Sequence, residues 1–119
     1  YEAIISKNID LYELINCSDL LISVHSTVIL EALALEKPVI QLNLMEKYDK
    51  FGEKANKLIK FVNIENQLSN AIKVLLYDKS YSKGLREKRK EFISEYFYKI
   101  DGKSTERFIK VLEGMLRRK

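Results

Sequence analysis

The chain of 119 residues has the length of one domain with one hydrophobic core. Its content of 46% hydrophobic and 32% charged residues excludes intrinsically disordered and fibrous classes. A single cysteine and a single histidine exclude an internal disulfide and a zinc site built on a histidine cluster. No apolar run approaches the roughly 18 residues of a membrane span. Because the sequence opens at Tyr1 without a methionine or a signal peptide, we expect a fragment of a longer chain.

The charge is distributed unevenly along the sequence. Residues 1–78 carry 8 Lys or Arg against 11 Asp or Glu, whereas residues 79–119 carry 13 against 6. The last third is therefore strongly basic. Such charges are most simply the solvated faces of surface helices, and they also suit attraction to an anionic membrane, to nucleic acid or to a phosphorylated ligand.

The N-terminal part predicts the start of an alternation between strands and helices. Residues 3–6 are apolar enough for a strand, and residues 10–17 carry apolar side chains at helical spacing. Cys17, at the end of that helix, is expected to be a small buried residue.

The next part predicts a βαβ unit. Residues 19–24 and 38–44 are short apolar runs, typical of strands covered on both faces in a parallel sheet. Residues 26–36 between them are apolar on nearly all sides and predict a buried helix with Ser26 as its N-cap. Such a crossover is right-handed in nearly every known protein.

The alternation continues after this unit. Residues 45–57 are polar and contain Gly52, which predicts a loop, and a short strand is expected at 58–62. Asn63 is placed to cap a following helix. The apolar residues of that helix recur with the helical period at Ile64, Leu68, Ala71, Ile72, Leu75 and Leu76.

Two helices are expected to close the chain. The first has an apolar stripe within residues 81–97, and Ser104 is the expected N-cap of the second. We expect the second helix to turn inward the side chains of Phe108, Ile109, Leu112, Met115 and Leu116. The whole pattern predicts an α/β fold in one domain over residues 1–119, a Rossmann-like parallel sheet of three to four strands flanked by helices and ending in two or three helices.

A ligand site is expected where the first βα connection ends. In open α/β sheets, ligands bind beyond the carboxyl ends of the strands, at the start of the next helix. His25, Ser26 and Thr27 occupy that position, and the two hydroxyls suit an anionic group such as phosphate. Glu31 shares a helix face with Thr27. With a diphosphate at the helix start, the Glu31 carboxylate can accept two hydrogen bonds from ribose hydroxyls.

Each of these residues also has a simpler interpretation. Ser26 can be an ordinary N-cap, Glu31 can point to solvent, and His25 can bond to backbone near the turn. The His25 side chain is also of a type that contacts phosphate or acts as an acid or base. No catalytic residue is assigned, because no partner carboxylate follows from the spacing.

Four stretches resemble a known group of enzymes. They are residues 9–23 (IDLYELINCSDLLIS), 25–32 (HSTVILEA) and 37–40 (KPVI), with a looser match at 101–107 (DGKSTER). These stretches resemble the C-terminal domain of GT-B transferases. The greatest similarity is to UDP-N-acetylglucosamine 2-epimerases and to CDP-glycerol glycerophosphotransferases, with related surface-polysaccharide enzymes.

The resemblance implies a nucleotide-diphosphate site that faces an N-terminal acceptor domain. Ser26 and Thr27 would hold the diphosphate, and Glu31 would hold the ribose. The implied function is to bind the donor, a UDP-sugar or a CDP-alcohol, for a glycosyl or polyol-phosphate transferase that builds surface polysaccharide. Without the acceptor domain, this chain is expected to be inactive. The sequence demands neither a metal nor a cofactor, and the implied location is the cytoplasm, with peripheral contact at the inner membrane face left open.

The chain departs from the related enzymes at several positions. Epimerases usually carry two glycines after the serine, where Thr27 and Val28 stand here, and a pair of acidic residues where only Glu31 stands. Glycerophosphotransferases tend to have an acidic or aromatic residue at the position of His25, and the usual glycine before Lys37 is Glu36. These departures weigh against epimerase chemistry and leave neither subfamily matched throughout.

Two other classes of function compete with the transferase. The chain can be a non-catalytic module that docks on a partner or an anionic membrane surface through its basic C-terminal helices. A nucleic-acid partner is not expected, because no glycine-rich clamp, zinc knuckle or aromatic RNP-like pattern is present. A flavodoxin-like regulatory domain is disfavoured, because its carboxylates lie at strand ends whereas Asp19 begins its strand.

Overall fold

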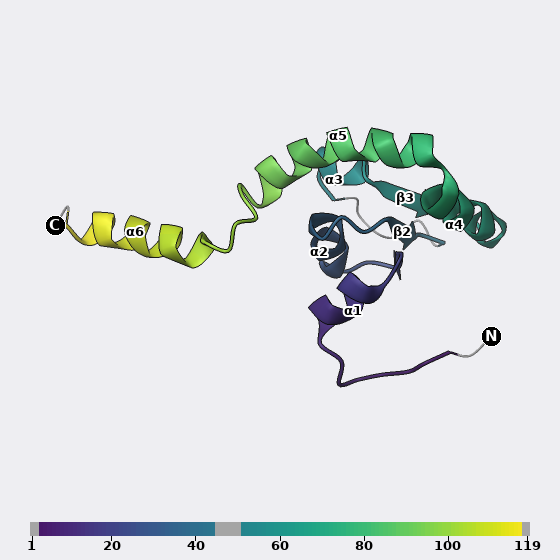
Figure 1. The fold of residues 1–119 in the computed structure, drawn as a ribbon, viewed down its shortest axis with the longest axis horizontal. Coiled ribbons are helices and arrows are strands. Elements are labelled where there is room, and N and C mark those ends of the chain that lie inside the picture. Colours follow the sequence, from purple (N-terminus) through teal and green to yellow (C-terminus); the bar gives the residue numbers. More distant parts are fainter. Residues whose placement is uncertain (1–2, 45–50, 118–119) are drawn as a thin grey trace.

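The computed structural model describes residues 3–44 and 51–117, which form a three-stranded sheet and its surrounding helices (Figure 1). The strands pair in parallel in the order β1-β2-β3. The predicted α/β fold with a Rossmann-like parallel sheet is confirmed. The elements in chain order are α1 (Leu11–Cys17), β1 (Leu21–Ser23), α2 (Val28–Ala34), β2 (Val39–Leu42), α3 (Glu53–Asn56), β3 (Ile59–Val62), the 3-10 helix η1 (Glu65–Gln67), α4 (Leu68–Tyr77), α5 (Lys79–Tyr96) and α6 (Ser104–Leu116).

The central strand, β2, is deeply buried, whereas the first strand, β1, lies at an edge of the sheet. Val39 and Ile40 of β2 are completely buried, as expected for a strand with neighbours on both sides. In β1, Ile22 is 41% exposed. The expectation of two strands covered on both faces is therefore confirmed for β2 and wrong for β1, because no described segment fully covers the face on which Ile22 lies.

Helices α2, α4 and α5 bury one apolar face each around the sheet. Helical spacing brings Ile29, Ala32 and Leu33 of α2 to one side, so the predicted buried helix is confirmed over a shorter range. The other buried apolar residues are Ile15, Ala55, Leu58, Ile59, Val62, Ala71, Leu75, Leu85 and Phe92. This single cluster makes the described body one packing unit.

The C-terminal end of α2 has an unusual residue in a left-handed conformation. The Lys37 N–H donates to the Ala32 carbonyl at 2.9 Å, and the Glu36 N–H donates to the Leu33 carbonyl at 3.2 Å. This is a Schellman motif, and its left-handed position is normally glycine. Here it is Glu36, with φ of 62°, which costs roughly 1–2 kcal/mol for a residue with a Cβ atom. Glu36 stands where the related enzymes usually have a glycine before Lys37. This departure therefore lies at the position of the Schellman motif that favours glycine.

Two predictions in the N-terminal part are wrong. Residues 3–6 form no strand, and Ile4 and Ile5 are almost fully exposed, because no strand of the described chain pairs with them. Cys17 is exposed rather than buried, since α1 contributes only Ile15 to the core.

Two further predictions fail in the middle of the chain. Within the expected loop at 45–57, Glu53–Asn56 forms α3 and buries Ala55, while residues 45–50 lie outside the described part. Asn63 does not cap the next helix, because η1 intervenes and α4 begins after Gln67 without a side-chain cap. The strand expected at 58–62 is confirmed as β3.

Helix α5 packs on the core, whereas α6 extends away from the sheet and the other helices (Figure 1). The apolar stripe expected for the first of these helices is confirmed by buried Leu85 and Phe92. The inward packing expected for the second is wrong, because no residue of α6 is buried and Phe108 is 64% exposed. The radius of gyration is accordingly 17.4 Å, against about 13.5 Å for a compact chain of this length.

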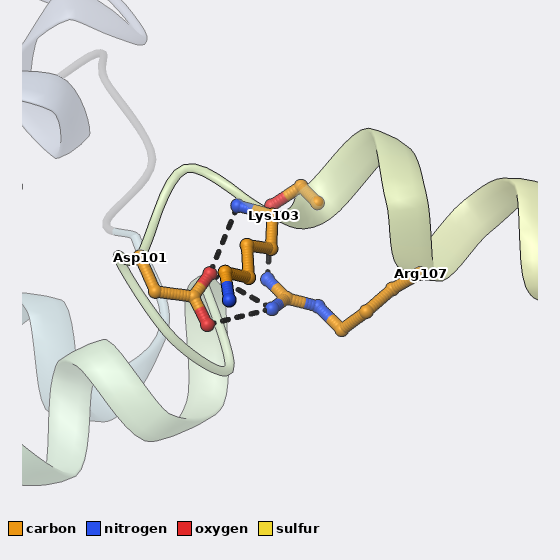
Figure 2. Close-up of polar contacts among 4 residues, drawn as sticks. Asp101, Lys103 and Arg107 are labelled. Atoms are coloured by element: carbon orange, nitrogen blue, oxygen red, sulfur yellow. Dashed lines mark hydrogen bonds and ion pairs between the residues drawn. The ribbon is translucent and has the colours of Figure 1, made fainter.

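The turn between α5 and α6 is organised by the Asp101 carboxylate (Figure 2). Oδ1 accepts the Lys103 N–H at 3.0 Å, and both carboxylate oxygens accept from Arg107 Nη1 at 2.8 and 2.9 Å. Ser104 is the first helical residue rather than the predicted N-cap, and its hydroxyl accepts from Arg107 Nη2 at 3.1 Å. The predicted cap is therefore wrong: Lys103 is the N-cap residue without a side-chain cap hydrogen bond, and Asp101 orders the turn that precedes it.

The pKa of Asp101 should respond to loss of the Arg107 guanidinium. The hydrogen bond from Arg107, then that from the Lys103 N–H, lowers the pKa of Asp101 below its ordinary value. The stabilisation is therefore present above the unfolded-state pKa and is lost as the pH falls through the folded-state value. We expect Arg107→Ala to raise this pKa, measured from the Asp101 carboxyl carbon by NMR. Lys103→Ala removes one cation but keeps the backbone donor, and an equal rise in that control would contradict the assignment.

Candidate functional site

The connection from β1 to α2 presents the predicted residues at the carboxyl end of the sheet. The Ser26 hydroxyl accepts the Val28 N–H at 3.3 Å, and the Ser26 carbonyl accepts the Ile29 N–H at 3.1 Å. The predicted N-cap at Ser26 is therefore wrong by one residue: Thr27 is the N-cap residue, and the Ser26 hydroxyl supports the helix start from the position before it. The Thr27 side chain is exposed and makes no cap hydrogen bond. Both hydroxyl protons can be donated to an anion at this position.

Glu31 lies one helical turn beyond Thr27 and is half-buried. Its Oε2 atom is buried, and no donor among the described residues reaches it. A buried carboxylate oxygen without a donor is costly, so such an atom is normally satisfied by protein, water or ligand. The simpler interpretation, that Glu31 merely points to solvent, does not fit this burial. A pair of hydroxyls from a bound molecule would supply the missing donors.

His25 is exposed at the same connection and stacks on Phe51. Their ring centroids are 5.3 Å apart with an interplanar angle of 20°. The stack joins the β1–α2 connection to the residues before α3, and the Phe51 carbonyl accepts the Asn56 side-chain amide. Spacing along the sequence contained no signal for this contact, because Phe51 fell in a segment expected to be a loop.

Two polar residues in and just after β2 were not among the predicted site residues. Gln41 is completely buried, and both polar atoms of its side chain lack a partner among the described residues. Asn43, just beyond the strand, is 9% exposed, and its N–H donates to the Val62 carbonyl at 2.9 Å. Gln41 pairs in register with Ser23 of β1, two residues before His25. The available signal was the appearance of polar residues at alternate positions in an otherwise apolar strand.

The two hydroxyls at the start of α2 are of a type that donates hydrogen bonds to an anionic group. Among residues 3–44 and 51–117, no group of three His, Cys, Asp or Glu side chains is placed to hold a metal ion. In the same part of the chain, no helix has the length and apolarity to cross a membrane. The predicted residues His25, Ser26, Thr27 and Glu31 thus lie together on one connection and the first turn of α2, and their role in binding stays a prediction.

Comparison with known proteins identifies one family. A family model described as CDP-Glycerol:Poly(glycerophosphate) glycerophosphotransferase matches residues 2–114. No curated protein and no solved structure gives a significant match. The expected resemblance to glycerophosphotransferases is confirmed by this match, whereas the resemblance to epimerases and to the GT-B group stays a prediction.

Proposed function

The chain belongs to the CDP-glycerol:poly(glycerophosphate) glycerophosphotransferase family, and on that premise we propose that it binds the nucleotide donor of such a transferase. The observation that carries the proposal is a family match over nearly the whole chain. It favours a CDP-alcohol over a UDP-sugar as donor. We further propose a GT-B arrangement in which this domain faces an N-terminal acceptor domain, in a cytoplasmic enzyme of surface-polymer synthesis.

The transfer places specific demands on the donor site. A hydroxyl of the growing poly(glycerophosphate) attacks the glycerol-linked phosphorus of CDP-glycerol. A new phosphodiester forms, the bond to CMP breaks, and the hydroxyl proton is lost to a base. Negative charge develops on the departing CMP phosphate. Donors held in place before the reaction stabilise such charge most effectively.

The residues of the β1–α2 connection meet these demands in our proposal. The Ser26 and Thr27 hydroxyls donate to the diphosphate, and Glu31 Oε2 accepts from the ribose hydroxyls. His25, beside Ser26, contacts the phosphate or the transferred proton. The unpartnered Oε2 atom of Glu31 supports this assignment, because ribose would complete its hydrogen bonding.

We expect CDP and CDP-glycerol to bind, with NMR shifts confined to the amides around Ser26. Glu31→Ala should weaken this binding about tenfold or more, because hydrogen bonds to a charged group contribute roughly 1.5–3 kcal/mol. Ser26→Ala and Thr27→Ala should also weaken it without unfolding the chain. Glu13→Ala, an exposed glutamate on α1, is the matched control. Unchanged affinity in all three site variants would refute the donor site.

A further inference from the structure

One face of α5 carries a row of cations. Lys79, Lys83, Arg86 and Lys90 follow one another at intervals of four, three and four residues, about one helical turn of 5.4 Å each. The row extends over about 16 Å of helix. Arg89 flanks it toward the core, with a side chain only 12% exposed. These five residues are called the α5 stripe below.

The α5 stripe borders three adjoining hollows in the surface. Lys79, Lys83 and Arg86 line a hollow of about 320 Å³. Arg86 and Arg89 line a second of about 160 Å³, together with Glu36. A third hollow, of about 350 Å³, is lined by Glu36, Arg86, Arg89 and Lys90. Arg86 contributes to all three hollows, which follow one another along α5 and are together called the track below.

The positive charge of this track is poorly compensated. No side chain of the described residues forms an ion pair with Lys79, Lys83 or Arg86. Lys90 is paired only with exposed Glu87, at 3.7 Å on the same helix. Exposed pairs of this kind contribute little and are readily exchanged for another anion.

An unsatisfied hydrogen-bond donor of Arg89 gives the clearest indication that an anion binds here. Its Nε atom is buried and has no hydrogen-bond partner in the described part of the chain. Its ion pair, with Glu36 Oε2, has a separation of 3.7 Å, too long for a good hydrogen bond. Burial, with a smaller opposing effect of Glu36 and repulsion from Arg86, lowers the pKa of Arg89 below its ordinary value. A buried guanidinium normally has its donors filled.

We propose that the α5 stripe binds successive phosphates of the poly(glycerophosphate) acceptor. The identity of this polymer rests on the proposed function. A linear polyanion with one negative charge per repeat matches a linear row of cations, and Arg86 and Arg89 can each donate two parallel hydrogen bonds to a phosphate. The hollows provide room for the chain between the side chains.

A membrane surface fits the α5 stripe less well. Helices that lie in a membrane interface place large apolar side chains beside their basic residues, and these enter the lipid. On α5, the large apolar residues Leu85 and Phe92 are buried in the protein core. The other apolar side chains beside the cations, such as Leu76 and Ile93, line the hollows and are therefore recessed rather than projecting toward a lipid surface.

At Arg89, the α5 stripe is separated from the proposed donor site by the length of α2. Glu36, which contacts Arg89, follows the C-terminal end of α2, whereas Ser26 and Thr27 precede its N-terminal end. The seven-residue helix between them is about 10 Å long. The stripe would therefore hold the body of the polymer, while the reacting end lies elsewhere. Such a hold keeps the acceptor near the enzyme between transfers.

The test is binding of a short, fluorescently labelled glycerol-phosphate oligomer to the 119-residue chain, followed by anisotropy at several salt concentrations. We expect Arg86→Gln to weaken binding by about tenfold and to reduce the slope of log affinity against log salt by about one. Lys88→Gln, on the opposite face of the same helix, is the charge-matched control and should change neither. Glu36→Gln should strengthen binding, because it removes the carboxylate that competes for Arg89.

Several outcomes would overturn the proposal. The first is that the oligomer does not bind, and the second is that Arg86→Gln and Lys88→Gln weaken its binding equally. The third is that inorganic phosphate displaces the oligomer at equal phosphate concentration. The fourth is that phosphatidylglycerol vesicles bind in an Arg86-dependent way while the oligomer does not bind. Titration with CDP separates the two proposals. If CDP binds and the oligomer does not, only the stripe assignment fails. If the oligomer binds and CDP does not, only the donor site fails.

Discussion

Replacing Phe92 by alanine should lower the free energy of unfolding by about 3–5 kcal/mol. Phe92 is completely buried on α5, and its ring lies 4.9 Å from that of Tyr96 and 5.7 Å from that of Phe97. The substitution removes the contacts of a large ring and leaves a cavity that its aromatic neighbours cannot fill. Since small domains have total stabilities of only about 5–15 kcal/mol, the loss is a large fraction of the whole. Urea unfolding followed by circular dichroism measures it.

Phe108→Ala on α6 is the matched control. The chemical change is the same, but the Phe108 side chain is 64% exposed, so the expected change is within about 0.5 kcal/mol. A loss as large as that for Phe92 would show that α6 packs on the body in solution, in conflict with the extended arrangement of Figure 1. A small effect for Phe92→Ala would equally contradict its place in the core.

The fold could be predicted where burial follows from local pattern. The apolar runs of β2 and β3 and the largely apolar α2 indicate their burial in the sequence, and each of the three contributes buried residues to the core. The exposed segment at residues 3–6 is just as apolar in places, yet it has no strand beside it. The local pattern predicts that a segment is suited to form a strand. Whether a neighbouring strand is present to pair with it depends on the rest of the fold.

Helix α6 shows the same limit for helices. The spacing of Phe108, Ile109 and Leu112 correctly predicted a helix with one apolar face. Periodicity states that the face is apolar, but it does not state which surface covers it. Among the described residues, nothing buries this face, so the inference from apolar to inward-facing was the step that failed.

The candidate site was likewise predictable from the sequence only in part. The positions of Ser26, Thr27 and Glu31 followed from the rule that ligands bind after parallel strands, which depends on topology alone. The buried, unpartnered Oε2 atom of Glu31 and the stack of His25 on Phe51 depend on packing between distant segments. Residue spacing carries no information about such contacts, so only the structure supplied them.

Gln41→Met should raise the free energy of unfolding by about 1–3 kcal/mol. The Gln41 side chain is completely buried, and neither its oxygen nor its nitrogen has a partner in the described part of the chain. Folding removes this amide from water without replacing its hydrogen bonds, and an apolar side chain of similar volume avoids that penalty. Urea unfolding measures the gain, and Ile40→Met, at the neighbouring buried position of β2, controls for the introduction of methionine.

The same variant should bind CDP-glycerol more weakly. A buried amide without partners is rare in a folded protein and calls for an explanation such as a ligand or an ion. Gln41 pairs in register with Ser23 of β1, the strand that leads directly into the proposed donor site. Its amide is completely buried in the free protein, so we expect donor binding to bring a water or a donor group within its reach. Greater stability with weaker binding would assign Gln41 to the site. A loss of stability would show instead that the amide is already satisfied within the free protein, and the donor role of Gln41 would then be rejected.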